Sequence, residues 1–226
     1  MQGLVEQFHR RTATDVVFDE LHAEIVSLTL LPGTKLSEVE IARRFGVSRQ
    51  PVRDAFNRLE NLDLLLIRPQ KATEVRGFSM HRIAQARFVR LAVELEVIRH
   101  ACEAWDSDDT RALNLNLEQQ RQSVEENQAE KFHTLDYQFH KLICDRSGCP
   151  GAFDMIQACK QKVDRLCMLS LVKDTEFVSL VDDHQQIANA LESQSTDDAF
   201  AVVRQHLSRL DKTISEIHES HSEYFE

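Results

Sequence analysis

Two sets of side chains in this sequence are of types, and at spacings, that could do chemistry. The first set lies at helical spacing on the polar side of one segment and comprises Arg49, Gln50, Arg53 and Asn57. Arginine and amide side chains pair with guanine edges, adenine edges and phosphates in the major groove of DNA. Ser48, just before them, is of a type that begins helices. The set therefore predicts a helix that contacts DNA bases. The competing interpretation is an ordinary surface helix with solvated arginines.

The second set contains four potential metal ligands, namely Asp136, His140, His184 and His206. Asp136 and His140 lie four residues apart, so on a helix both project from one face and can bind one ion. His184 and His206 each lie at helical spacing from apolar residues, which turns them toward a buried side. Facing helices of a bundle commonly build metal sites. With ten histidines in the chain, hydrogen-bonded core histidines remain an equally simple interpretation of the spacing.

The segment 36–59 has the layout of a helix-turn-helix. Ser37 and Glu40 are expected to begin its first helix as a reciprocal capping box, and Gly46 is expected to end that helix. Pro51 falls in the first turn of the second helix, where its missing N–H costs nothing. The buried face of the second helix is predicted to consist of Val52, Ala55, Phe56 and Leu59.

A short hairpin is predicted after the second helix. Residues 64–67 and 74–76 suit two strands, and residues 68–73 suit the turn between them. Arg68 and Lys71 at the turn could touch phosphates or a minor groove, or could simply be solvated. The hairpin would be the wing of a winged helix-turn-helix.

Charge divides the chain into two parts. Residues 1–78 hold 11 Lys and Arg against 11 Asp and Glu, whereas residues 79–226 hold 16 against 26. The acidic part would repel phosphates, so binding to nucleic acid is expected only of the first part. Because the first part has no net charge, we expect a dimer to double the DNA contacts.

Beyond residue 78 the sequence is helix-patterned throughout. Its only glycines and proline are Gly148, Pro150 and Gly151, which cluster in one turn. The predicted fold class is mainly α, with an N-terminal winged helix-turn-helix domain (1–78, including a polar arm over 1–14) and an all-α bundle of six to seven helices (79–226). Helices are expected near 15–31, 79–105, 108–127, 129–147, 150–171, 177–193 and 196–221.

Cysteine usage and hydropathy suggest the compartment. Five cysteines without zinc-ribbon or C-x-x-C spacing fit a reducing cytosol. No apolar run approaches the roughly 18 residues that span a membrane, and the first residues lack the layout of a signal peptide. The expected location is the cytoplasm, with no membrane partner.

The whole arrangement resembles the GntR superfamily of regulators, in its FadR-like branch with an FCD ligand-binding domain. The first domain carries the resemblance in Leu36-Ser37-Glu38, Phe45-Gly46-Val47-Ser48-Arg49 and Pro51-Val52-Arg53-Asp54-Ala55. The second carries it in Arg90-Leu91-Ala92-Val93-Glu94, Asp136-Tyr137-Gln138-Phe139-His140, His184-Gln185-Gln186-Ile187 and His206-Leu207.

The resemblance implies a transcription factor, mostly a repressor, that binds a palindromic operator as a homodimer and responds to a small carboxylate effector such as a sugar acid or hydroxy acid. It implies that Asp136, His140, His184 and His206 bind a divalent ion, for which three imidazoles and one carboxylate suit Zn²⁺ or Ni²⁺. Arg90 could anchor the effector's carboxylate, or could pair with Glu94 four residues on.

Two positions depart from the family pattern. Val39 stands where arginine is frequent, so one DNA contact is missing. The wing turn reads Gln70-Lys71-Ala72 where many relatives have glycine, which puts a backbone contact in the minor groove in doubt.

Three other functions compete with this interpretation. A metal-dependent hydrolase would use the ligands but leave the winged helix idle, and the chain has no H-E-x-x-H base. A regulator whose helical domain only dimerises would not need the four ligand positions. An acyl-CoA sensor would not need the histidines. We therefore expect no enzyme activity.

Overall fold

A computed structural model describes residues 11–169 and 174–226. They divide into two compact units, the first comprising the described residues up to Phe78 together with Glu223–Glu226, and the second Ser79–Ser222. The sequence-based division had placed 223–226 with the helical part. Residues 1–10 of the predicted arm lie outside the described residues, and Ala13 already begins the first helix.

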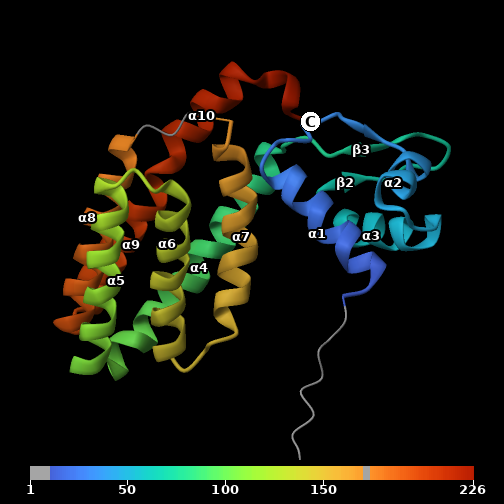
Figure 1. Cartoon of the computed structure of the whole chain (residues 1–226). Helices are drawn as coiled ribbons and strands as arrows, with labels where there is room; N and C mark the ends of the chain where they lie inside the picture. The colour runs from blue at the N-terminus through green and yellow to red at the C-terminus, as the bar shows by residue number, and fades with distance from the viewer. Residues whose placement is uncertain (1–10, 170–173) are drawn as a thin grey trace, which may run out of the picture. The chain divides into compact units, whose positions relative to one another are not determined.

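The first unit is a three-helix core with a small antiparallel sheet (Figure 1). Its elements are α1 (Ala13–Val26), β1 (Lys35–Leu36), α2 (Glu38–Phe45), α3 (Arg49–Asn61), β2 (Leu65–Leu66) and β3 (Thr73–Val75). The sheet order is β1-β3-β2. The hairpin of β2 and β3 is the predicted wing, and β1 is a third strand that the sequence did not reveal. The winged helix-turn-helix is confirmed.

Local sequence explains the turn between α2 and α3. Gly46 ends α2 in the left-handed region at φ 64°, and α3 begins at Arg49, which puts Pro51 in its first turn. The buried face of α3 packs against α1 and is the predicted one, with Val52, Ala55, Phe56 and Leu59 all at most 1 % exposed.

The expected capping box at Ser37 is wrong. Ser37 does precede α2, but its side chain makes no capping hydrogen bond. Ser37 directly follows β1, whose register is fixed by pairing of Lys35 with Glu74 and Leu36 with Thr73. Strand pairing therefore sets the entry to α2, and it overrides the local preference of the serine.

The second unit is an all-α bundle whose helices run side by side (Figure 1). Within the described residues they are α4 (Met80–Ala104), α5 (Ser107–Glu125), α6 (Ala129–Arg146), α7 (Ala152–Cys167), α8 (Asp174–Glu192), α9 (Thr196–Ser208) and α10 (Leu210–Ser220). Seven described helices agree with the predicted six to seven. The helix expected over 196–221 is divided at Arg209, whose backbone stays helical at φ −55° and ψ −34°.

One apolar cluster fills the bundle. It joins residues of α4, α5, α6, α7, α8 and α9, among them Ala101, Leu117, Phe139, Ile156 and Leu191. Burial of this cluster is the main force that fixes the helices against one another. No described helix is long and apolar enough to cross a membrane.

Candidate functional site

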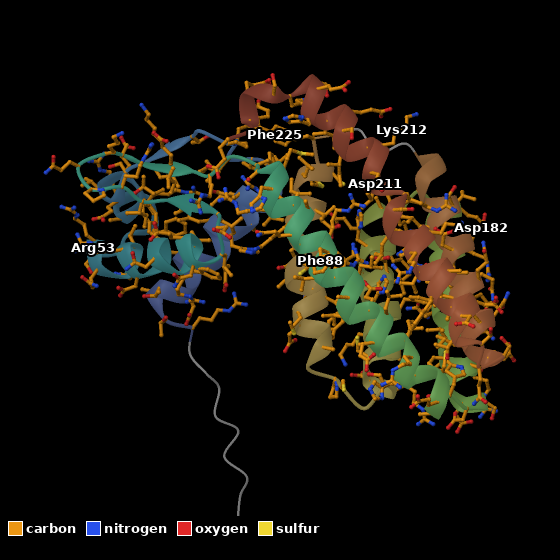
Figure 2. The ribbon with its side chains drawn as sticks, turned by 180° about the vertical axis from the view of Figure 1, so that it is seen from behind. Arg53, Phe88, Asp182, Asp211, Lys212 and Phe225 are labelled. Atoms are coloured by element: carbon orange, nitrogen blue, oxygen red, sulfur yellow. The ribbon has the colours of Figure 1, made fainter. Side chains whose placement is uncertain are left out.

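The polar face of α3 is exposed, as the sequence predicted. Arg53 projects away from the body of its unit (Figure 2). The side chains of Arg49 and Arg53 are 60 % and 50 % exposed, and both pair with Glu38 of α2, at 2.9 and 3.0 Å. The arginine hydrogen bonds lower the pKa of Glu38. Gln50 donates to Asp54 at 2.9 Å, and Asn57 is exposed on the same helix.

The wing holds its cations differently. Arg68 donates to Glu74 across the hairpin at 2.7 Å, whereas Lys71 is exposed at the turn. Gln70 adopts φ +59°, the left-handed conformation that favours glycine. The wing turn therefore holds a residue other than glycine in a backbone conformation that glycine adopts most easily.

The four candidate metal ligands come together in the core of the bundle. Asp136 and His140 lie on α6, His184 on α8 and His206 on α9, and each is at most 5 % exposed. The three histidines each offer a ring nitrogen within 4.8 Å of the others. Asp136 Oδ1 lies 3.4 Å from His184 Nε2 and 3.8 Å from His140 Nε2. The three histidines could hold one metal ion, and Asp136 lies beside two of them.

A chain of hydrogen bonds fixes the tautomer of His184. Asn116 Nδ2 donates to the Leu135 carbonyl at 3.1 Å, Gln120 Nε2 donates to Asn116 Oδ1 at 2.7 Å, and His184 Nδ1 donates to Gln120 Oε1 at 2.8 Å. With the proton on Nδ1, Nε2 carries a lone pair. Among the described residues this buried Nε2 has no hydrogen-bond donor.

The lone pair of His184 Nε2 therefore faces a carboxylate oxygen, Asp136 Oδ1, at 3.4 Å. Two acceptors face each other in a buried place, which is unfavourable unless a cation lies between them. Burial, followed by the charge of His206, lowers the pKa of His184 well below its ordinary value, so the ring is neutral as a metal ligand must be. This arrangement fits a divalent ion.

The other two histidines also have acidic neighbours behind them. His140 Nδ1 lies 3.3 Å from Glu94 Oε2, and His206 Nδ1 lies 3.6 Å from Asp183 Oδ2. Burial raises the pKa of Asp183, but the hydrogen bonds from Arg209 and the proximity of His206 outweigh it and lower the pKa to about 2. Such carboxylates orient ligating imidazoles and increase their basicity.

Arg90 pairs with Glu94, which is the second of the two interpretations of its sequence position. Its Nε donates to Glu94 Oε1 at 2.6 Å, and its other end lies 3.4 Å from His140 Nε2. Burial raises the pKa of Glu94, but His140 and Arg90 together lower it below its ordinary value. Arg90 is thus a charged, buried neighbour of the candidate metal ligands.

Sequence reasoning missed Gln120, Lys160 and Asp183 of this site, and it named Glu94 only as a possible partner of Arg90. Lys160 Nζ lies 3.0 Å from Asp136 Oδ2. A signal existed for Lys160, which shares the apolar face of Ile156 and Val163 on α7. The small cavity beside His140 and Glu94 has room for about one water molecule, so in this form the protein offers little free volume at the site.

The comparisons with known proteins agree with this architecture. Residues 13–75 match the family described as bacterial regulatory proteins, gntR family, and residues 85–209 match the FCD domain. The chain is 34 % identical over 92 % of its length to the HTH-type transcriptional repressor RspR of Escherichia coli, 92 % of which is covered. It is 27 % identical to the gluconate operon transcriptional repressor of Bacillus subtilis, with 77 % of this chain and 74 % of that one covered.

Solved structures share the fold. The structure of Escherichia coli McbR/YncC matches with a TM-score of 0.70 at 20 % identity, over 93 % of this chain and 99 % of that one. The family and these relatives are transcriptional regulators and not enzymes, which removes the hydrolase alternative. The chain belongs to the GntR family of DNA-binding transcriptional regulators and carries an FCD domain.

Proposed function

We propose that this protein is a ligand-responsive repressor, which binds a palindromic operator as a homodimer and changes its affinity for DNA when a small carboxylate enters the helical unit. The observation that carries the proposal is the pair of acceptors, His184 Nε2 and Asp136 Oδ1, that face each other in the core. Two of the relatives are named as repressors, which supports that sign of regulation. Because such a repressor acts on chromosomal DNA, we expect the protein to be located in the cytoplasm.

The proposed ligands are Asp136, His140, His184 and His206. Three imidazoles and one carboxylate suit Zn²⁺ or Ni²⁺. When bound, the ion would hold a carboxylate of the effector at its remaining coordination positions. Arg90 supports this role because its guanidinium already lies 3.4 Å from His140 Nε2, and a guanidinium is a strong donor to carboxylates.

For the DNA side, we propose that Arg49, Gln50, Arg53 and Asn57 contact base edges and that Ser48, Arg68 and Lys71 contact the backbone. All of these residues except the half-buried Arg68 are exposed, which supports this assignment. Exposed ion pairs contribute little to stability, so DNA can replace Glu38 as the partner of both arginines at small cost. In a dimer whose two α3 helices lie about 34 Å apart, which is one turn of DNA, each helix would contact one half of a palindrome.

A homodimer needs a surface on which two copies can meet. On α4, Phe88 is 73 % exposed, and it points away from the bundle (Figure 2). On α7, which packs against α4, Met155 is 53 % exposed. Large exposed apolar side chains on adjacent elements are typical of interaction sites. We therefore propose α4 and α7 as the surface that dimerises.

The test begins with selection of duplexes from a random DNA pool by the zinc-loaded protein. The proposal predicts that an inverted repeat is enriched. The selected duplex is then titrated with protein in the presence of a panel of carboxylic acids, with and without a chelator. One acid should change the affinity only when the ion is present. If an inverted repeat were enriched but no acid changed the affinity of the protein for it, the result would instead support a helical unit that only dimerises.

A further inference from the structure

Lys160 is a buried cation beside the candidate metal ligands that the proposed function does not use. It lies on α7 and is 7 % exposed. Its Nζ lies 3.0 Å from Asp136 Oδ2 and donates to both carboxylate oxygens of Asp164 at 3.0 Å. It also lies over the ring of Tyr137, 4.7 Å from the centroid. A buried ammonium is costly unless it is paired, so its neighbours must be charged.

Lys160 and a metal ion would share one partner. Asp136 turns Oδ1 toward His184 and His140 and Oδ2 toward Lys160. An ion at Oδ1 would withdraw charge from the carboxylate and would repel the ammonium. Lys160 is then left with Asp164, which is partly exposed and already accepts a hydrogen bond from the Tyr137 hydroxyl at 2.8 Å. The ammonium has donor capacity for a further anion.

A charge count indicates what that anion is. The buried site holds two cations, Arg90 and Lys160, and a divalent ion would bring the positive charge to four. The neighbouring carboxylates are Glu94, Asp136 and Asp164, which supply three negative charges. A fourth carboxylate, Asp183 behind His206, is balanced by its own pair with Arg209 and does not change the count. The histidines are neutral as ligands. One positive charge remains, so one additional carboxylate balances the site, whereas a second would be an unpaired buried charge.

We infer that Lys160 is a second cationic anchor for the effector, released from Asp136 by the metal ion, and that with Arg90 it selects an acid carrying a single carboxylate. The inference rests on the proposed function, because it concerns the effector of that same site. It predicts that loss of Lys160 raises the affinity for zinc and lowers the affinity for the acid. Loss of a residue with only a structural role would not change the two affinities in opposite directions.

The first measurement is zinc affinity in the absence of any acid, by competition with a chelating dye. Lys160→Met should bind zinc about 10- to 100-fold more tightly than the wild type, because the ammonium no longer competes for Asp136. The matched control is Lys212→Met on α10 (Figure 2), whose side chain is 87 % exposed and pairs with Glu216. It should bind zinc as the wild type does. If Lys160→Met lowered the zinc affinity or left it unchanged, the idea that Lys160 and zinc compete for Asp136 would be overturned.

The second measurement is the affinity of the zinc-loaded proteins for propionate and succinate, which differ by one carboxylate. The wild type should prefer propionate, and Lys160→Met should lose about 10- to 100-fold in propionate affinity. Lys160→Gln provides a second variant if methionine disturbs the fold, and uptake of one zinc per chain reports that the ligands are in place. Unchanged propionate affinity in both variants, or a preference for succinate, would overturn the inference alone. A wild type that takes up zinc but binds neither acid would overturn the proposed effector class as well.

Discussion

The two units of the protein hold their cationic side chains in opposite ways. In the DNA-binding unit, the side chains of Arg49 and Arg53 are half or more exposed, and they share Glu38. In the helical unit, the side chains of Arg90 and Lys160 are 8 % and 9 % exposed and pair with carboxylates on every side. Exposed pairs can be exchanged at little cost, whereas buried pairs are costly to form and to break.

This difference indicates how each unit meets its partner. The arginines of α3 can exchange Glu38 for DNA without any change in the core. The helical unit has room for about one water molecule beside His140, so an acid must displace existing contacts to enter. A ligand that requires a new arrangement of the buried pairs binds one conformation of the bundle more tightly than the other. This difference in affinity allows the ligand to shift the equilibrium between the two conformations.

The largest effect is expected from the buried site. His184→Ala removes the nitrogen that faces Asp136. Loss of a residue that only orients a ligand lowers metal affinity by about 10- to 100-fold, and the loss of His184 itself should lower zinc affinity by more than that. Gln120→Leu, which removes the partner of His184 Nδ1 at 2.8 Å, should lose about 10- to 100-fold. Elemental analysis after zinc loading measures both. Full occupancy of His184→Ala would show that the ligand set is wrong, and DNA affinity without acid should be unchanged in either variant.

The next effect is expected on the exposed face. Arg49→Ala and Arg53→Ala should each lose about 1 to 3 kcal/mol of discrimination between the selected operator and a scrambled duplex. The measurement is binding to both duplexes at one salt concentration. Arg58→Ala is the control, since Arg58 lies on α3 but pairs with Asp15 of α1 at 2.9 Å. If discrimination were the same in all three variants, α3 would not read bases through these arginines.

A smaller effect concerns pH and is expected mostly in the helical unit, because burial lowers the pKa of one histidine in the DNA-binding unit, His22, and of three in the helical unit. In the metal-free protein, burial lowers the pKa values of His133, His184 and His206 of the helical unit. A histidine with a lowered pKa is protonated first in the unfolded chain, so stability is present above the unfolded value of about 6.5 and is lost as pH falls below it. Thermal unfolding from pH 7.5 to 5.5 should show this loss. Zinc-loaded protein should resist it until the ligands are protonated, and equal sensitivity with and without zinc would contradict the account.

The smallest effect is expected from Glu38→Gln. Loss of two exposed ion pairs should change the free energy of unfolding by less than about 1 kcal/mol. Affinity for scrambled DNA should rise a few-fold, roughly as removing one negative charge near phosphates predicts. Glu24→Gln, which loses a pair with Arg44 instead, is the matched control. A fall in affinity for scrambled DNA specific to Glu38→Gln would mean that Glu38 positions the arginines for binding and does not compete with phosphate.

The same contrast explains how much the sequence could predict. The helix-turn-helix was readable because its signals are local, such as Gly46, Pro51 and the spacing of the apolar residues of α3. His184 and His206 were placed on the correct helices because each lies on an apolar face, and Asp136 and His140 because they lie four residues apart in one helix-patterned segment. The pair of Arg90 with Glu94 on one helix was among the expectations, because the two residues lie four apart. The contacts of Glu94 with His140, of Lys160 with Asp136 and of Asp183 with Arg209 were not predicted, since periodicity gives no pairing between helices.

Two local expectations failed for a related reason. Ser37 does not cap α2, because the pairing of β1 with β3 sets the chain direction there. The division of the last predicted helix at Arg209 has no glycine or proline to announce it. Its side chain is instead held by Asp183 of α8, a contact between helices that one sequence does not display.

The central claim is that a metal ion in the bundle holds the acid that regulates DNA binding. The most direct test is thermal unfolding of zinc-loaded and chelator-treated protein with a panel of mono- and dicarboxylic acids, because a ligand that binds only the folded state raises the melting temperature. The account predicts that at least one monocarboxylic acid raises it when zinc is present and has no effect after chelation. An equal rise after chelation, or no rise with any acid, would contradict it.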